Sequence, residues 1–270
     1  MKKTIRKIAH AMLVLFGLSV LFSCSSQSKL TNGGTTLRLH PEQGKTYTIT
    51  TNANMMIMME VQGQTMNMSQ NMETRQTFTA KEVSDTQSTL ETQIEAIKMT
   101  MSQMGMKFEY DSEHPEKTSP MLAGQTQEIE AKLNKPTDIT YDALGKLVGD
   151  SIDSSMNQLG VIIELPKNNV TVGSSWTTIT SQEASGMEFK ADITYTVKAI
   201  SKKSIDLTYT GTVNGDVAEI SGTYEGTASI DPQTGIMTNG SQKQNISMTI
   251  KDQGMSIPMT IVGNTTVEMK

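Results

Sequence analysis

The chain has 270 residues, a net charge of −5 and a pI near 5.3, so it is long enough for one large or two small domains. The acidic balance excludes a nucleic-acid-binding protein, because that class needs basic stripes on its surface. A single cysteine excludes an internal disulfide, and an aromatic content of only 4% argues against a surface that stacks sugars.

The amino-terminal segment is predicted to direct export. Four basic residues precede an apolar run, Ala11–Phe22, that is too short to span a bilayer. The residues that end the run, Leu21-Phe22-Ser23-Cys24, resemble the bacterial lipobox. This resemblance implies that residues 1–23 are a removable signal peptide and that an acylated Cys24 anchors the mature protein to the membrane.

Residues 24–36 are small and polar, which predicts a flexible tether between the anchor and the folded body. The tether contains no aspartate or glutamate. In Bacteroidetes-type lipoproteins, an acidic run directly after the cysteine is associated with display on the cell surface. We therefore expect an outer-membrane lipoprotein that faces the periplasm.

Most of the remaining chain has the pattern of antiparallel strands, because apolar and polar residues alternate between closely spaced turn residues. Three predicted strands show the pattern: Thr46–Thr50, Met55–Val61 and Thr65–Met68. Gln62-Gly63 suits a tight hairpin between the last two. One helix is predicted at Met121–Leu133, after Pro120, and the sequence allows a second at Asp150–Leu159.

An internal repeat divides this part of the chain. Three pairs of segments match in the same order: Gly44–Thr48 with Gly173–Thr177, Thr77–Ser84 with Thr194–Ser201, and Ile139–Leu147 with Ser229–Met237. The last pair contains two predicted turns, in which Asp142 and Asp231 bind nearby backbone and Gly145 and Gly235 take a positive φ. The sequence therefore predicts a mainly β protein with two related curved antiparallel sheets, half-barrel or sandwich-like, and one or two short helices between them.

Several segments carry a resemblance to a known family: Gly44 to Tyr47, Tyr110-Asp111-Ser112, Tyr141–Lys146 and Leu165–Trp176. Together with the predicted helix, they resemble a family of Bacteroidetes lipoproteins known only as a domain of unknown function. The resemblance covers residues 37–269, and Ser174 stands where the family usually has an aspartate. It implies organisation and location only, since the family brings no catalytic residues. We place the first β unit at residues 37–160 and the second at residues 161–270.

No motif for catalysis is present. His40 and His114 are far apart in the sequence, and no nucleophile elbow, zinc-helix motif or phosphate-binding glycine loop occurs. We therefore expect a protein that is not an enzyme and has no cofactor. The short motif Asp150-Ser151-Ile152 resembles the O-glycosylation acceptor of Bacteroidetes, which makes Ser151 a candidate modification site.

Methionine is the unusual component, with 21 residues in the chain. Many lie in two clusters: Met55, Met56, Met58, Met59, Met66, Met68 and Met72, and then Met99, Met101, Met104 and Met106. Three interpretations are open. The flexible thioethers fill core positions of strands, or they line a cavity for apolar ligands of variable shape. In the third, Met-x-Met pairs, whose sulfurs lie about 7 Å apart on one face of a strand, bind Cu(I) or Ag(I).

We predict that the chain binds an apolar or amphipathic ligand without catalysis, with the two methionine clusters as the apolar wall. The alternative is an interaction module that docks another envelope protein through the outer faces or edges of its sheets. A methionine site for Cu(I) or Ag(I) is a lesser alternative. A continuous apolar cavity would favour ligand binding, whereas a filled interior with an exposed apolar patch would favour a protein partner.

Overall fold

The computed structural model describes residues 34–61, 63–120, 122–149, 161–184, 187–215, 220–252 and 255–270. The elements in chain order are β1 (Thr46–Val61), β2 (Gln64–Val83), β3 (Gln87–Gln103), β4 (Met106–Asp111), η2 (Pro115–Lys117), α2 (Ala123–Lys132), β5 (Thr137–Asp142), β6 (Ser175–Ala184), β7 (Met187–Ile200), β8 (Ile205–Gly215), β9 (Ser221–Ile230), β10 (Met237–Asp252) and β11 (Met255–Met269). None of the helices within these ranges has the length and apolar character needed to cross a membrane.

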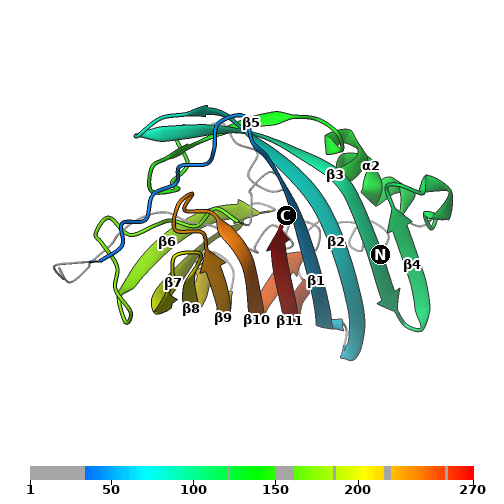
Figure 1. Ribbon diagram of the computed structural model, residues 1–270. Helices are drawn as coiled ribbons and strands as arrows, with labels where there is room; N and C mark the ends of the chain where they lie inside the picture. The colour runs from blue at the N-terminus through cyan, green and yellow to red at the C-terminus, as the bar shows by residue number, and fades with distance from the viewer. Residues whose placement is uncertain are drawn as a thin grey trace.

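The strands form one open antiparallel sheet (Figure 1), in the order β4-β3-β2-β1-β11-β10-β9-β8-β7-β6, with β5 also paired to β3. The prediction of a mainly β, antiparallel fold is confirmed. The two predicted sheets are continuous, however, because β11 pairs with β10 on one side and with β1 on the other. The β1–β11 register runs from Ile49 opposite Met269 to Met59 opposite Met259. This pairing joins strands that are far apart in the sequence, so no local sequence pattern predicts it.

The predicted helix Met121–Leu133 is confirmed as α2, with slightly shorter bounds. It lies at the edge of the sheet near β3 and β4 (Figure 1), where Ile129 packs in one apolar cluster with Tyr110 of β4. Three further predictions fall outside the described residues: the helix at Asp150–Leu159, the acylation of Cys24 and the glycosylation of Ser151.

The matched segments of the repeat lie at equivalent places in two four-stranded units, β1-β2-β3-β5 and β6-β7-β8-β9. In each unit, two stacked rings join the first strand to the second. Tyr47 stacks on Phe78 with 4.8 Å between ring centroids, and Trp176 stacks on Tyr195 with 5.2 Å. A β-bulge follows at matched residues, Lys81 and Lys198. The main difference is the insertion of β4, η2 and α2 into the first unit.

The turns that follow β5 and β9 also match. The carboxylate of Asp142 accepts a hydrogen bond from the backbone N–H two residues later at 2.9 Å, and that of Asp231 does the same at 2.8 Å. Gly145 and Gly235 complete the turns with φ values of 80° and 70°. Both turn predictions are therefore confirmed, down to the role of each aspartate and glycine.

Two arms close the end of the sheet where these turns lie. The first arm is residues 34–41 and the second is residues 161–170. The first arm bridges both units, because the N–H of Leu39 donates to the turn after β5 and the N–H of His40 to the turn after β9, each at 2.9 Å. Apolar side chains of both arms and both units form one buried cluster, which we call the arm-end cluster. This end of the fold is filled.

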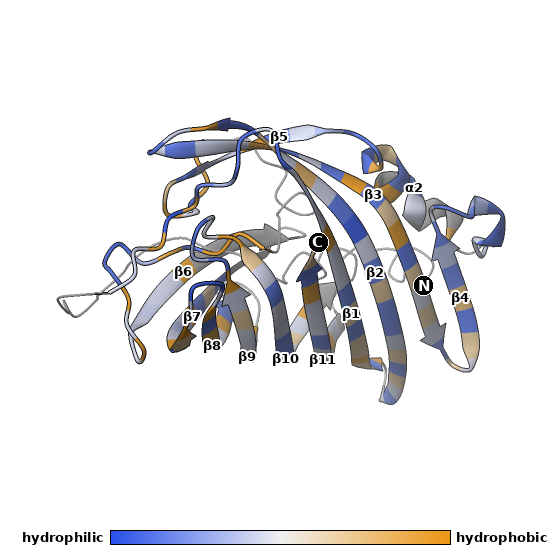
Figure 2. Ribbon diagram, viewed as in Figure 1, coloured by the Kyte–Doolittle hydropathy of each residue, from blue (hydrophilic) through white to orange (hydrophobic). Residues whose placement is uncertain are grey.

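Alternation along the strands gives the sheet two different faces, visible as the colour changes along each ribbon in Figure 2. The buried residues of β1 are Tyr47, Ile49, Ala53, Met55, Ile57 and Met59, and the remaining residues of the strand are half-buried or exposed. We call the buried side the inner face and the opposite side the outer face. A second apolar group on the inner face, the hairpin-end cluster, comprises Met55, Ile57, Met59, Met68, Val213, Ile220, Tyr224, Ile246, Met248, Ile257, Met259 and Ile261.

Candidate ligand-binding face

Four methionines form a row across the inner face. Met248 of β10 pairs with Met259 of β11, Met259 pairs with Met59 of β1, and Met59 pairs with Met66 of β2. Directly opposed residues on one face have Cβ atoms about 5 Å apart, so these thioethers lie side by side. Three methionines of the row, Met248, Met259 and Met59, belong to the hairpin-end cluster and are at most 3% exposed. The row crosses that cluster, which continues past it at Ile257.

The predicted methionines divide between the two faces. By register and burial, the inner face holds Met55, Met59, Met66, Met68, Met72, Met99 and Met101. The outer face holds Met56, which is 52% exposed, and the half-buried Met58. Met104 is 77% exposed in the β3–β4 turn with a φ of 50°, and Met106 at the start of β4 is 51% exposed. The structure thus gathers five of the set at the hairpin-end cluster, places Met72 and Met99 in a separate cluster with Tyr110 and Ile129, and leaves these four outside both.

Met248 and Met259 complete the row but were not singled out from the sequence. The signal that could have found them is alternation, because isoleucines stand two residues before and after each of them. That pattern predicts inward methionines in a late hairpin. It does not predict contact with the early methionine hairpin, which depends on the β1–β11 pairing.

A belt of uncharged polar side chains lies on the inner face between the two apolar clusters. Its buried members are Gln70, Thr74, Gln76, Thr178, Gln242, Gln244 and Thr265. Gln242 donates to the amide oxygen of Gln244 at 3.4 Å, and Gln244 donates to the sulfur of Met55 at 3.7 Å. Gln70 likewise donates to the sulfur of Met99 at 3.4 Å. A thioether is a weak acceptor, so these amides are weakly satisfied.

Several buried polar atoms near this belt have no hydrogen-bond partner among the described residues. They are the amide oxygen of Gln70 and the hydroxyls of Thr74, Thr178 and Tyr224, all in side chains at most 8% exposed. An unsatisfied buried group costs about 1–3 kcal/mol, and such groups in proteins usually have a partner in water or a ligand. Burial also raises the pKa of Tyr224, so its phenol stays a neutral donor. The belt can therefore both donate and accept hydrogen bonds.

Most charges lie on the outer face. By register, the one inward position of the described strands with a charged residue is Asp252, which opposes Met255 beside the β10–β11 turn. On the outer face, Glu113 accepts from Arg75 at 2.7 Å and pairs with Lys98 at 3.0 Å, and these hydrogen bonds lower the pKa of Glu113 to about 2. Among the described residues, the one buried charged side chain is Glu164 of the second arm.

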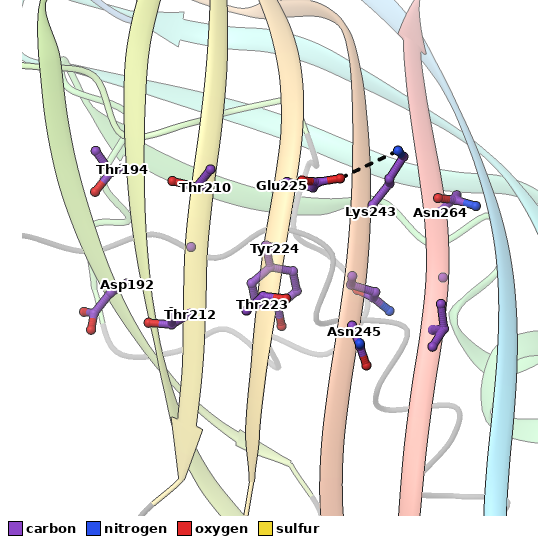
Figure 3. A pocket seen from close by; sticks show the side chains of 14 residues that line it. Asp192, Thr194, Thr210, Thr212, Thr223, Tyr224, Glu225, Lys243, Asn245 and Asn264 are labelled. Atoms are coloured by element: carbon purple, nitrogen blue, oxygen red, sulfur yellow. Dashed lines mark ion pairs between the residues drawn. The ribbon is translucent and has the colours of Figure 1, made fainter.

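The outer face of β7 to β11 carries a polar depression of about 710 Å³. Figure 3 shows its side chains in two rows across the strands, one from Thr194 through Glu225 and Lys243 to Asn264 and one from Asp192 to Asn245. Lys243 and Glu225 form an ion pair at 3.6 Å. By register these labelled threonine, asparagine and charged side chains lie on the outer face, and the depression also borders the buried residues Tyr224 and Gln244.

The other candidate residues do not assemble. His40 lies in the first arm, and His114 precedes η2 near Glu116, with 3.4 Å between its Nδ1 and the carboxylate. Within the described part of the chain, no group of three or more histidine, cysteine, aspartate or glutamate side chains is arranged to hold a metal ion.

A family profile described as "Family of unknown function (DUF6263)" matches residues 126–251, from α2 into β10. The expected resemblance to a domain of unknown function is confirmed over that range. No curated protein matches the sequence.

Three solved structures show distant likeness. One is a lipovitellin structure described as "Lipid-protein interactions in lipovitellin". It is 14% identical to this chain with a TM-score of 0.48, and the match covers 85% of this chain and 25% of the other. An outer membrane channel from Pseudomonas putida F1 is 8% identical with a TM-score of 0.27, covering 90% and 100%. DynF from Micromonospora chersina is 10% identical with a TM-score of 0.25, covering 93% and 94%. The chain spans about a quarter of the length of the lipovitellin chain, and at these scores the likenesses carry no argument about function.

Proposed function

We propose that the chain binds an amphipathic ligand on its inner face and catalyses no reaction. The observation that carries the proposal is the position of the hairpin-end cluster beside a buried polar belt, in which Gln70, Thr74 and Thr178 each have an atom without a partner among the described residues. The side chains of the wall are at most 7% exposed, so the chain of an amphiphile would enter among the flexible thioethers while its head reaches the polar atoms. Methionine suits the wall because its flexible side chain adapts to ligands of different shape.

The proposed location follows from the sequence alone. Acylated Cys24 would anchor the chain to the outer membrane, and the part of the predicted tether that precedes the first arm, residues 24–33, would hold the folded body in the periplasm. A binder at that place would meet lipids and other amphiphiles directly. Native mass spectrometry of the protein purified from its own membrane would weigh both the acyl group and any retained ligand.

The test of the inner face uses two neighbouring methionines that point in opposite directions. Met55 is 7% exposed on the inner face and Met56 is 52% exposed on the outer face. Met55→Gln places an amide in the apolar wall and should weaken binding of an apolar fluorophore about tenfold, whereas Met56→Gln should leave it unchanged. Equal effects of the two substitutions, or no binding by the unaltered chain, would contradict the proposal.

An interaction module remains the rival proposal, and one observation favours it. Met56 and Val262 are opposed on the outer face and are 52% and 42% exposed, which makes a small apolar patch beside the polar depression. Loss of an envelope partner in Met56→Gln, with apolar probe binding absent, would favour this rival. Titration with Cu(I) under reducing conditions tests the thioether-metal alternative, and binding weaker than micromolar would remove it.

A further inference from the structure

We infer that the ligand of the inner face is an uncharged amphiphile, with hydroxyl or carbonyl groups in its head and an alkyl chain. The inference rests on the proposed function and narrows it to a chemical class. Monoacylglycerols, fatty esters and long-chain alcohols belong to this class. Fatty acid anions, phospholipids and cationic amphiphiles do not.

The first argument is the distribution of charge. An ionic head buried on this face would need a counter-ion, because an unpaired ion loses far more on leaving water than a neutral polar group. By register, the one inward position of the described strands that carries a charged residue is Asp252, beside the β10–β11 turn and at the end of the wall away from the belt, so it is not placed to serve a head at the belt. The one buried charged side chain of the described residues, Glu164, already takes part in an interaction, and its carboxylate would repel an anion. The part of the inner face around the belt therefore selects against a charged head.

The second argument is the kind of polar atom that lacks a partner. The amide oxygen of Gln70 can only accept a hydrogen bond, so it needs a donor such as a hydroxyl. The hydroxyls of Thr74 and Tyr224 can donate to a carbonyl or ester oxygen as well as accept. Hydroxyl and carbonyl groups suit each of these atoms, and because the atoms lie on separate strands or four residues apart, one small head pairs with one of them at a time. A hydrocarbon without a head satisfies none of them.

The third argument is the size of the apolar wall beside the belt. On β1, the inward residues of the wall run from Met55 to Val61, which is a length of about 20 Å at the rise of a strand. The row of four methionines crosses this stretch at Met59. Gln70 pairs with Met55, so the belt lies at the end of the wall nearer the arms. An extended chain along the wall thus places its head at the unpaired atoms.

The experiment compares three probes that have the same alkyl chain and different heads: monododecanoylglycerol, dodecanoate and dodecyltrimethylammonium. Each displaces the neutral fluorophore N-phenylnaphthylamine from the full chain below its micelle concentration. We expect the glycerol ester to bind at least about 100-fold more tightly than either ion, because only the ions need a counter-charge. Ions that bind within threefold of the ester would overturn the inference while leaving the proposed function intact. Failure of the fluorophore and all three probes to bind would instead overturn the proposed function.

A substitution in the belt tests the hydrogen bond separately. Gln70→Leu should weaken binding of the glycerol ester about fivefold, the effect of one neutral hydrogen bond, and should leave fluorophore binding unchanged. This variant should fold, because it removes an unsatisfied buried atom. Asn67→Leu is the control, since Asn67 is exposed on the outer face of the same strand. Equal ester affinity in the unaltered chain and in Gln70→Leu would contradict the role of Gln70.

Discussion

Substituting alanine for two glycines that have the same φ distinguishes the cost of backbone strain from the cost of a steric clash. Gly44 and Gly145 both have a φ of 80°, which costs an alanine about 1–2 kcal/mol. A Cβ at Gly44 would have no atom within 4 Å, whereas a Cβ at Gly145 would lie 2.5 Å from the carbonyl oxygen of Ile163 in the second arm. Because backbone atoms must move to relieve that contact, Gly145→Ala carries a further cost of about 1–3 kcal/mol.

Each alanine also restricts the unfolded chain, which returns about 0.4–1 kcal/mol in both variants. We expect Gly44→Ala to lower the free energy of unfolding by about 1 kcal/mol and Gly145→Ala by about 2–4 kcal/mol. For a domain of this size, Gly44→Ala should lower the Tm by about 3 °C and Gly145→Ala should lower it by about 10 °C. Circular dichroism during heating and in urea measures both. Equal losses in the two variants would refute the packing of this turn on the arm.

Three further substitutions test other parts of the fold. Tyr224→Phe should leave the free energy of unfolding unchanged or raise it by about 1 kcal/mol, whereas Tyr209→Phe should lower it by about 1 kcal/mol, because Tyr209 donates to a β10 carbonyl and Tyr224 has no partner in the described residues. Trp176→Phe should lower it by about 2 kcal/mol in urea denaturation, since the indole N–H donates to a carbonyl of the second arm at 2.9 Å. Hydrogen bonds from Arg75 and a lysine lower the pKa of Glu113 from 4.5 to about 2, so its contribution to stability is complete above pH 4.5 and is lost as the pH falls toward 2. In Glu113→Gln, the urea midpoint of unfolding should change less between pH 4.5 and pH 2 than in the unaltered chain. The same pH dependence in both proteins would show that this network does not stabilise the fold.

Local features of the fold could be predicted from the sequence, because their causes are local. The alternation in Met55–Val61 places Met55 and Met59 on one side of a strand, and the structure buries both. The turn at Asp142 follows from an aspartate that bonds backbone two residues later and from Gly145, which tolerates a positive φ. The helix at Met121–Leu133 follows from its residue spacing.

The remaining features depend on contacts between distant segments. The methionine row needs the β1–β11 pairing, which no spacing within either hairpin specifies. The contacts of the arms could not be predicted either, because an apolar stretch such as Val161–Leu165 has no sequence pattern that indicates which turns it contacts. The face of Met56 could be predicted relative to Met55, but its exposure depends on the whole curvature of the sheet. The methionine content alone therefore indicates the candidate site, whereas its geometry depends on the pairing of distant strands.

The duplication makes the two ends of the sheet unequal. At the arm end, the turn at Gly145 packs on the second arm and the turn at Gly235 packs on the first, so each unit stabilises the arm that precedes the other. This reciprocal closure fills that end with well-packed apolar side chains. At the hairpin end, β10 and β11 join the units, and buried groups such as Gln70 and Tyr224 stay without partners among the described residues. Sequence rules are most often broken at functional sites, so the larger number of unpartnered groups away from the arm end supports our proposal that the ligand binds there.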